Sequence, residues 1–239
     1  MSTDHKNAVN TVVYMIPCPI EPTAMQTIPA GTLTILHSIT CFIAEKAKTA
    51  RHFIKNSGHP VALQRMRIVD IEDTSDPWQN LLSEAVQKGL SVGVLSEAGC
   101  PGVADPGAIV VKWAHEKKIK VVPLTGPSSI LLALMASGFG GQQFTFMGYL
   151  PSKAPALLPK IKQIEQTASR GITQIFMEAP YRNGFLLEHI IKVCQDNTLL
   201  CVACDISSDT ENIITQKISA WKKTDISVYH KRPCIFLMG

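Results

Sequence analysis

The sequence predicts an α/β protein, and three observations carry that prediction. Short apolar runs of strand length recur along the chain, most of them are followed by a helical segment, and several end in a loop of small residues. Repeated alternation of strand and helix is typical of a sheet covered by helices. Hydrophobic residues make up 46% of the 239 residues and charged residues 18%, which is enough apolar material for a packed core.

The first half of the chain alternates regularly between the two kinds of element. In the expected helix 78–88, for example, apolar side chains such as Leu81 and Ala85 share one face. The expected strands are residues 11–16, 38–44, 61–68, 91–95 and 120–124, and the expected helices are 28–36, 45–56, 78–88 and 108–118.

The second half continues the pattern but ends in strands. A break near Thr125, close to mid-chain, indicates two α/β domains, residues 1–124 and 125–239. The expected strands are residues 144–150, 173–177, 199–206, 212–217 and 234–238, and the expected helices are 130–137, 157–168 and 184–194.

One stretch, Ser91–Gly107, organises the first half. An apolar strand ends in a glycine-rich loop, and Asp105 and Pro106 are residues that favour a helix start, as N-cap and first helical position. Ligands of α/β sheets bind outside the carboxyl ends of the strands. The stretch is therefore either a plain turn or a ligand loop. A second loop of small residues after a strand, Thr125–Ser129, favours the ligand loop.

Composition narrows the class of protein further. A net charge of +4 permits an RNA partner but is weak for a dedicated nucleic-acid binder. Cys201 and Cys204 form the only close cysteine pair and would point to opposite faces of a strand, so no metal site is expected. Residues 1–10 lack the apolar core of a signal peptide, and no apolar run reaches the roughly 20 residues that cross a bilayer. We expect a soluble, cytoplasmic protein.

Four segments, in order, resemble the motifs of one enzyme family. They are SEAGCPGVADPG, TGPSS, GYLPSK and EAPYR. They are similar to S-D-A-G-T-P-x-x-S-D-P-G, P-G-P-S-A, G-F-L-P-x-K and E-S-P-H-R of the tetrapyrrole-methylase superfamily of S-adenosylmethionine (SAM) enzymes. The branch with these runs methylates a ribose 2′-hydroxyl of small-subunit ribosomal RNA. The resemblance implies two α/β domains with a ligand cleft between them, a homodimer, and SAM in that cleft.

The resemblance also implies which residues bind SAM. Backbone amides and carbonyls at loop ends suit the amino, carboxylate, ribose and adenine groups of SAM. The implied cofactor residues are Pro19, Ile20, Ser96, Glu97, Ala98, Gly99, Asp105, Pro106, Gly107, Gly126, Pro127, Ser128, Met147, Gly148, Tyr149 and Leu150.

The acceptor side of the site is predicted at two later loops. The resemblance turns Lys153, Glu178, Tyr181 and Arg182 toward the acceptor. A hydroxyl acceptor needs a base, and Glu97, Glu178 and Lys153 are the candidates, among which the sequence does not choose. Tyr181 and Arg182 are either a nucleotide-stacking pair or a plain surface pair. Glu178 is either a solvated strand end or a site residue.

Several positions depart from the family's pattern. P-I-G-N becomes Pro19-Ile20-Glu21-Pro22, A-E-D-T-R becomes Ala44-Glu45-Lys46-Ala47-Lys48, and R-E-L-T-K becomes Cys204-Asp205-Ile206-Ser207-Ser208. The last change removes two positive charges, and an H-E-x-N segment is missing around residues 61–69. The SAM loops are thus better preserved than the acceptor side.

Three functions follow from these observations. The first is SAM-dependent methylation of ribosomal RNA, the second is methylation of a tetrapyrrole or another small molecule, and the third is a dimeric SAM-binding protein without catalysis. An RNA acceptor would need phosphate contacts. The available cations are Lys46, Lys48, Arg51, Lys153, Lys160, Lys162 and Arg182, of which Lys48 and Arg51 can share a helix face.

Overall fold

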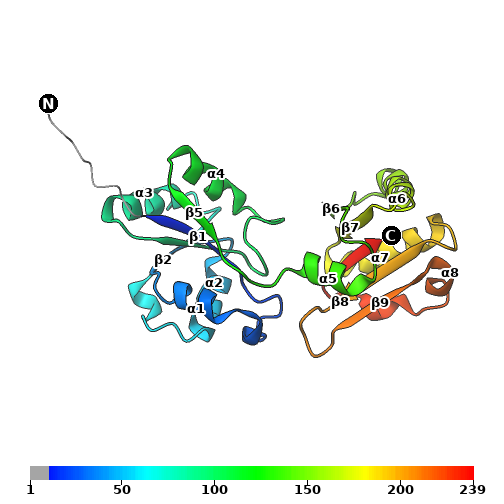
Figure 1. Ribbon diagram of the computed structural model, residues 1–239, viewed down its shortest axis with the longest axis horizontal. Coiled ribbons are helices and arrows are strands. Elements are labelled where there is room, and N and C mark those ends of the chain that lie inside the picture. Colours follow the sequence, from blue (N-terminus) through cyan, green and yellow to red (C-terminus); the bar gives the residue numbers. More distant parts are fainter. Residues whose placement is uncertain (1–10) are drawn as a thin grey trace. The chain divides into compact units, whose positions relative to one another are not determined.

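The computed structural model describes residues 11–239, so the expected polar N-terminal stretch, residues 1–10, lies outside it. The chain forms two compact units, Met1–Pro127 and Ser128–Gly239 (Figure 1). The domain boundary predicted from the sequence lies after Leu124. Each unit has a sheet with helices, which confirms the α/β fold class with two domains.

The first unit is built on a parallel sheet of order β3-β2-β4-β1-β5. All four neighbouring pairs run parallel, so the carboxyl ends of the strands lie at one edge of the sheet. The strands are β1 (Val12–Ile16), β2 (Cys41–Ala44), β3 (Arg67–Asp70), β4 (Val92–Leu95) and β5 (Lys120–Pro123). The predicted alternation of strand and helix therefore gives the predicted kind of sheet.

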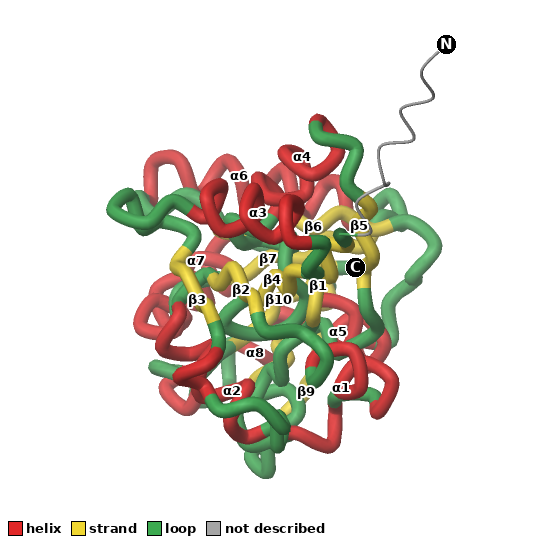
Figure 2. Tube along the Cα trace, turned by 90° about the vertical axis from the view of Figure 1, so that its left-hand side faces the viewer, coloured by secondary structure: helices red, strands yellow, loops and turns green. Residues whose placement is uncertain are grey.

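Helices cover both faces of this sheet (Figure 2). On one face, α3 (Trp78–Lys88) and α4 (Ala108–Glu116) pack Leu82 and Val110 against Val13 and Val94. On the other, α1 (Ala30–Leu36) and α2 (Ala47–Asn56) pack with Ile16, Phe42 and Leu95. Short 3-10 turns, η1 (Met25–Thr27) and η2 (Leu63–Arg65), complete the unit. Burial on both faces explains why β4 is an uninterrupted apolar run.

The second unit has a mixed sheet of order β6-β7-β10-β8-β9. β6 and β7 are parallel, and the other pairs are antiparallel. The strands are β6 (Phe144–Tyr149), β7 (Thr173–Met177), β8 (Leu199–Cys204), β9 (Asn212–Lys217) and β10 (Cys234–Met238). The helices are α5 (Ser129–Ser137), α6 (Ala154–Ala168), α7 (Asn183–Val193) and α8 (Ile218–Trp221), with 3-10 turns η3 (Pro180–Arg182) and η4 (Ile226–Tyr229).

The main core of the second unit lies under α6, α7 and α8. Ile161, Leu187 and Trp221 from these helices pack onto Phe176 and Phe236, whose rings are stacked with centroids 5.9 Å apart. Helix α5 packs against β9 and β10. It buries Ala133 and Leu134, but Leu131 and Met135 are 51% and 79% exposed, so only one side of this helix is in the core.

One predicted strand is wrong, and two short elements were not predicted. Residues 61–68 do not form one strand, because η2 intervenes and β3 begins only at Arg67. The His59 ring holds the segment before β3 in a turn. Its Nε2 lies 3.0 Å from the Ile39 carbonyl oxygen, and its Nδ1 accepts the Val61 N–H. Helix α8 and turn η4 were not predicted; both are too short to show a helical period.

Among residues 11–239, no helix is long and apolar enough to cross a membrane.

Candidate ligand-binding site

The loop 96–107 leaves the centre of the first sheet at its carboxyl edge. It follows β4, which lies between β2 and β1. Backbone hydrogen bonds tie the loop to both neighbours. Gly99 and Cys18 exchange N–H···O bonds of 2.8 and 3.0 Å, and the Glu45 N–H donates to the Leu95 carbonyl. The strand ends therefore fix the loop where ligands of α/β sheets bind.

The start of the loop is buried and tightly bonded. The Ser96 hydroxyl donates to the carbonyl oxygens of Ala98 and Gly99, both at 3.1 Å, and the Cys18 thiol donates to the Ser96 carbonyl. Burial raises the pKa of the Cys18 thiol to about 12, so it stays protonated. Gly99 has φ +69°, a conformation that residues with a side chain rarely adopt. The sequence therefore needs glycine at this bend.

Asp105 closes the loop with one carboxylate oxygen. Oδ1 accepts the N–H groups of Gly102 and Gly107, at 2.8 and 2.7 Å. Oδ2 is buried and has no hydrogen-bond partner within residues 11–239. The prediction that Asp105 is the N-cap of the helix is wrong, because Gly107 holds that position and α4 begins at Ala108. One carboxylate oxygen is therefore occupied by N–H groups of the loop itself, and the other oxygen can accept a hydrogen bond from a ligand.

Glu97 lies beside the start of α2. Its carboxylate accepts from Lys46 Nζ at 2.8 Å and from the Thr49 hydroxyl at 3.2 Å. Its backbone N–H donates to Glu45 Oε2 at 3.0 Å. Burial raises the pKa of the Glu45 carboxyl. Glu45 was not among the predicted site residues, and Lys46 was named only as a cation available to RNA, although residues directly after β2 reach the same sheet edge by the rule that identified Glu97.

The Thr125–Ser129 segment supplies the next part of this edge. Gly126 packs so closely on Pro17 that a Cβ atom would lie 2.3 Å from the Pro17 Cβ. The Pro127 carbonyl accepts from the Cys100 thiol at 3.4 Å. The structure thus brings the loops that hold the predicted cofactor residues of the first unit to one edge. These residues are Pro19, Ile20, Ser96, Glu97, Ala98, Gly99, Asp105, Pro106, Gly107, Gly126 and Pro127.

The remaining predicted residues lie in the second unit. Ser128 is the N-cap of α5, Met147–Leu150 end β6, and Lys153 is the N-cap of α6. Glu178, Tyr181 and Arg182 follow β7. Because β6 and β7 are parallel, the residues that follow them share one edge of the second sheet. Their roles stay predictions.

Glu178 and Arg182 form an ion pair at that edge. Arg182 Nε lies 3.1 Å from Glu178 Oε2, outside hydrogen-bond geometry, and Glu178 Oε1 accepts the Ala179 N–H. The Glu178 side chain is only 5% exposed, which is low for a solvated strand end. Arg182 also donates from Nη2 to the Ser152 carbonyl at 2.8 Å and stacks over the Phe185 ring. Both charges are thus committed within the unit.

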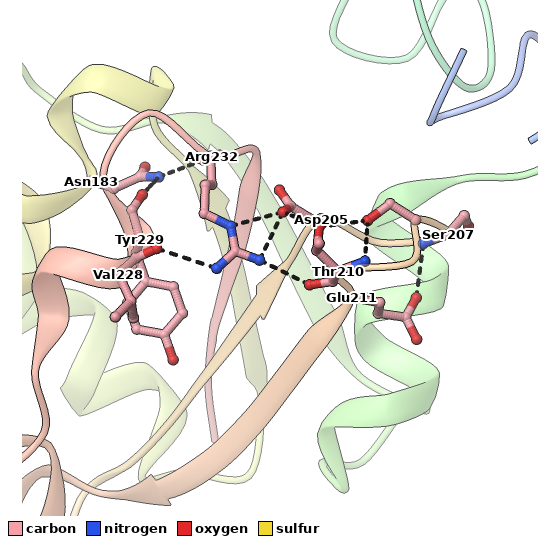
Figure 3. A network of polar contacts seen from close by, with 9 residues as sticks. Asn183, Asp205, Ser207, Thr210, Glu211, Val228, Tyr229 and Arg232 are labelled. Atoms are coloured by element: carbon pink, nitrogen blue, oxygen red, sulfur yellow. Dashed lines mark hydrogen bonds and ion pairs between the residues drawn. The ribbon is translucent and has the colours of Figure 1, made fainter. Parts of the chain in front are cut away.

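A second polar network joins the β8–β9 turn to the segment before β10 (Figure 3). Arg232 Nε donates to Asp205 Oδ2 at 2.7 Å, and its Nη2 donates to the Thr210 carbonyl. Asn183 Nδ2 donates to the carbonyl oxygens of Tyr229 and Arg232. Of these residues only Asp205 was named from the sequence, as part of a motif that departs from the family's pattern, and none was given a role. The basic pair Lys231-Arg232 just before a strand was the available signal.

Among the residues that the structure describes, no cluster of three or more His, Cys, Asp or Glu side chains is placed to hold a metal ion. The fold and the loop define a two-unit α/β protein with a carboxylate-lined loop, the candidate ligand site, at the carboxyl edge of a parallel sheet. A family model for tetrapyrrole (corrin/porphyrin) methylases matches residues 22–221. The chain belongs to that family and is a methyltransferase.

Characterised relatives point to one branch of the family. A protein of Vibrio cholerae named ribosomal RNA small subunit methyltransferase I is 29% identical over 214 residues, which cover 88% of this chain and 71% of the relative. The protein of the same name from Escherichia coli O157:H7 is 28% identical over 227 residues, covering 92% and 76%. A Buchnera aphidicola protein of this name is 32% identical over 156 residues, covering 64% and 54%.

Proposed function

We propose that this chain transfers the methyl group of SAM to a ribose 2′-hydroxyl of small-subunit ribosomal RNA. The observation that carries the proposal is the 96–107 loop, with its unpartnered Asp105 Oδ2, in a chain similar to named ribosomal RNA methyltransferases over most of its length. The named relatives supply the acceptor class, and the loop supplies a place for the methyl donor.

The chemistry of the loop fits SAM. SAM carries two positive groups, an ammonium and a sulfonium, and three carboxylates gather at this edge, those of Glu45, Glu97 and Asp105. Lys46 neutralises part of that charge through its 2.8 Å pair with Glu97. Asp105 Oδ2 is an acceptor in need of a donor, because an unsatisfied buried carboxylate oxygen is costly.

SAM, when bound, supplies a methyl group on an activated leaving group, so the protein's own task is alignment and proton removal. We assign alignment to the 96–107 loop, which its backbone bonds to Cys18 hold rigid. Of the candidate bases, Glu97 has a side chain 38% exposed, whereas that of Glu178 is 5% exposed. An incoming hydroxyl therefore reaches Glu97 more readily. Lys153 has an exposed side chain that offers hydrogen-bond donors and no acceptor, so it suits a phosphate contact better than proton removal.

A thiol-protection experiment tests the donor site. Cys100 lies in the loop and Cys41 begins β2 at the opposite edge of the sheet, and both thiols are partly exposed. With S-adenosylhomocysteine bound, we expect maleimide labelling of Cys100 to slow several-fold while Cys41 reacts at its unliganded rate, as read by mass spectrometry of the labelled peptides. Equal rates with and without millimolar ligand, together with no heat in a calorimetric titration, would reject the donor site.

A transfer experiment tests the acceptor. The protein and labelled SAM are incubated with small ribosomal subunits, with total RNA and with small-molecule extracts, in three separate reactions. We expect label in the subunits, on a ribose. Label in a small molecule would replace the proposed acceptor by a tetrapyrrole or similar compound. Donor binding without transfer to any of the three would indicate a binding protein that lacks catalysis.

We further propose that the protein works in the cytoplasm as a homodimer. The apolar side chains Leu131 and Met135 on α5 are exposed, and such side chains favour an interface. Light scattering at micromolar concentration checks this. A species of 26.1 kDa, the mass of one chain, would contradict the dimer.

A further inference from the structure

Three loops meet at one edge of the second sheet. β6 and β7 run parallel, and β10 runs antiparallel to β7. The ends of β6 and β7 therefore lie beside the start of β10, and residues 150–153, 178–182 and 230–233 share this edge. The first two loops hold the predicted acceptor residues. The third, His230–Pro233, was not predicted to take part.

Hydrogen bonds fasten the three loops to one another. Arg182 Nη2 donates to the Ser152 carbonyl at 2.8 Å, which joins the first loop to the second. The Lys231 N–H donates to the Pro180 carbonyl at 2.9 Å, and Asn183 Nδ2 donates to the Arg232 carbonyl at 2.7 Å, which join the second to the third. Figure 3 shows Asn183 and Arg232 on either side of this junction.

The third loop is held in an uncommon conformation. Lys231 has φ +60°, which costs a residue with a side chain about 1 kcal/mol or more. The surroundings enforce it. Arg232 donates to Asp205, to the Thr210 carbonyl and to the Val228 carbonyl, so the residue after Lys231 cannot turn (Figure 3). The backbone of Lys231 is bonded to the Pro180 carbonyl, next to Tyr181 in sequence, and the Lys231 side chain is exposed.

The charges at this edge divide into committed and free groups. Arg182 is paired with Glu178, and Arg232 is paired with Asp205. The side chains of Lys153 and Lys231 are exposed. Tyr181, from the second loop, is 67% exposed. The exposed acids Asp209 and Glu211 lie on the β8–β9 turn and limit the cationic area on that side. Among the described residues of the three loops, two lysines outside any ion pair and one exposed aromatic ring remain.

We propose that Lys153, Tyr181 and Lys231 form a contact surface for unpaired RNA, with Lys231 as its second phosphate contact. The proposal rests on the proposed RNA acceptor. Lysines neutralise backbone phosphates, and an exposed tyrosine offers a face on which an unpaired base stacks. Lys231 offsets the positive charge missing at Cys204–Ser208. Arg182 is a positioning residue that fixes the loops, rather than the phosphate contact expected from the sequence.

The test measures RNA affinity against salt. The probe is a fluorescein-labelled, unstructured RNA oligonucleotide bound by the full chain between about 50 and 200 mM salt. We expect Lys153→Ala and Lys231→Ala each to reduce the slope of log affinity against log salt by about 0.7, and the double variant by about 1.4. Lys223→Ala is the matched control. It removes an exposed lysine just after α8, which follows β9 at the opposite edge of the sheet, and should leave the slope unchanged.

Further variants separate stacking from charge. Tyr181→Leu should weaken binding roughly fivefold or more without changing the slope. Slopes for Lys231→Ala equal to those of the wild type or of Lys223→Ala would overturn the surface. Titration with S-adenosylhomocysteine on the same samples judges the proposed function separately. Donor binding with a normal Lys231→Ala slope rejects only the surface, whereas loss of donor binding in the wild type rejects only the methyl donor.

Discussion

One oxygen of Asp105 binds two backbone N–H groups, and the other is buried without a partner in the described chain. The two oxygens can be tested separately, because asparagine keeps an oxygen that can accept the loop bonds and exchanges the second oxygen for an amide. Asp105→Ala should lower the free energy of unfolding by about 2 kcal/mol or more and also abolish donor binding. Asp105→Asn should keep most of the stability and lose at least tenfold in donor affinity. Urea unfolding and calorimetry measure the two effects; unchanged affinity in Asp105→Asn would contradict the role of Oδ2.

Gly99 and Gly89 form a matched pair of left-handed glycines. Gly99 has φ +69° in the ligand loop, and Gly89 has φ +64° at the end of α3. Alanine at either position should cost about 1–2 kcal/mol of stability, because the backbone strain is the same. Only Gly99→Ala should weaken donor binding as well. Equal donor affinities for the two variants would show that the loop does not hold the ligand.

The buried thiol of Cys18 predicts a loss of stability in alkali. Its pKa is about 12 in the folded protein against 9.0 for a free thiol, because burial disfavours the thiolate. The unfolded chain releases this proton above pH 9 and the folded chain keeps it, so the stability is present below pH 9 and falls as the pH rises toward 12. At pH 10 the loss from this group is about 1.4 kcal/mol. Urea unfolding at pH 8 and 10 should show a smaller drop in Cys18→Ala than in the wild type; identical drops would refute it.

At the scale of elements, the sequence predicts strands and helices well where one period dominates. Helix 78–88 matches the structure at both ends, since its apolar face is regular and Gly89 ends it in the left-handed conformation. Strand 61–68 fails because the bonds of the His59 ring to residues far along the chain decide that turn. Local sequence cannot contain such contacts.

The candidate site likewise contains some residues that a sequence rule locates and others that only the folded structure shows. Glu97 and Asp105 could be located from the rule that ligands bind at the carboxyl ends of strands. Lys46 follows β2 and falls under the same rule, but Asn183 could not be located, because it meets the carbonyl oxygens of Tyr229 and Arg232 only in the folded chain. The same holds for Arg182. The sequence suggests a free cation at this position, whereas the structure makes it a clamp: its side chain joins the loop after β7 to the loop after β6.

That clamp predicts a stability effect. Arg182→Ala leaves the Glu178 carboxylate buried and unpaired, which should lower the stability of the second unit by about 3 kcal/mol. Arg170→Ala, which removes an exposed arginine of the same unit, should change it by less than about 0.5 kcal/mol. With both variants made in a Trp78→Phe/Trp113→Phe background, the fluorescence of Trp221, buried in that unit, follows the urea unfolding. Similar stabilities of the two variants would contradict the clamp.

At the scale of the whole molecule, two separate cores predict two unfolding transitions. Trp78 and Trp113 lie in the first unit and Trp221 in the second. Trp221→Phe therefore reports on the first unit alone, and the double variant Trp78→Phe/Trp113→Phe reports on the second. We expect different urea midpoints from the two reporters, and donor should raise the first midpoint. A single shared midpoint in both, measured beside circular dichroism of the wild type, would show one cooperative body instead.

The position of β10 in its sheet sets an order of events during synthesis. β10 follows every other described strand along the chain, yet it lies in the sheet between β7 and β8. Until it emerges from the ribosome, the β6–β7 pair and the β8–β9 hairpin have no common strand, whereas the first unit already has all five of its own. The nascent chain thus has a complete sheet in its first unit while the sheet of its second unit is still open and apolar. During that interval a chaperone would be needed, and a mutation in β10 would be most harmful.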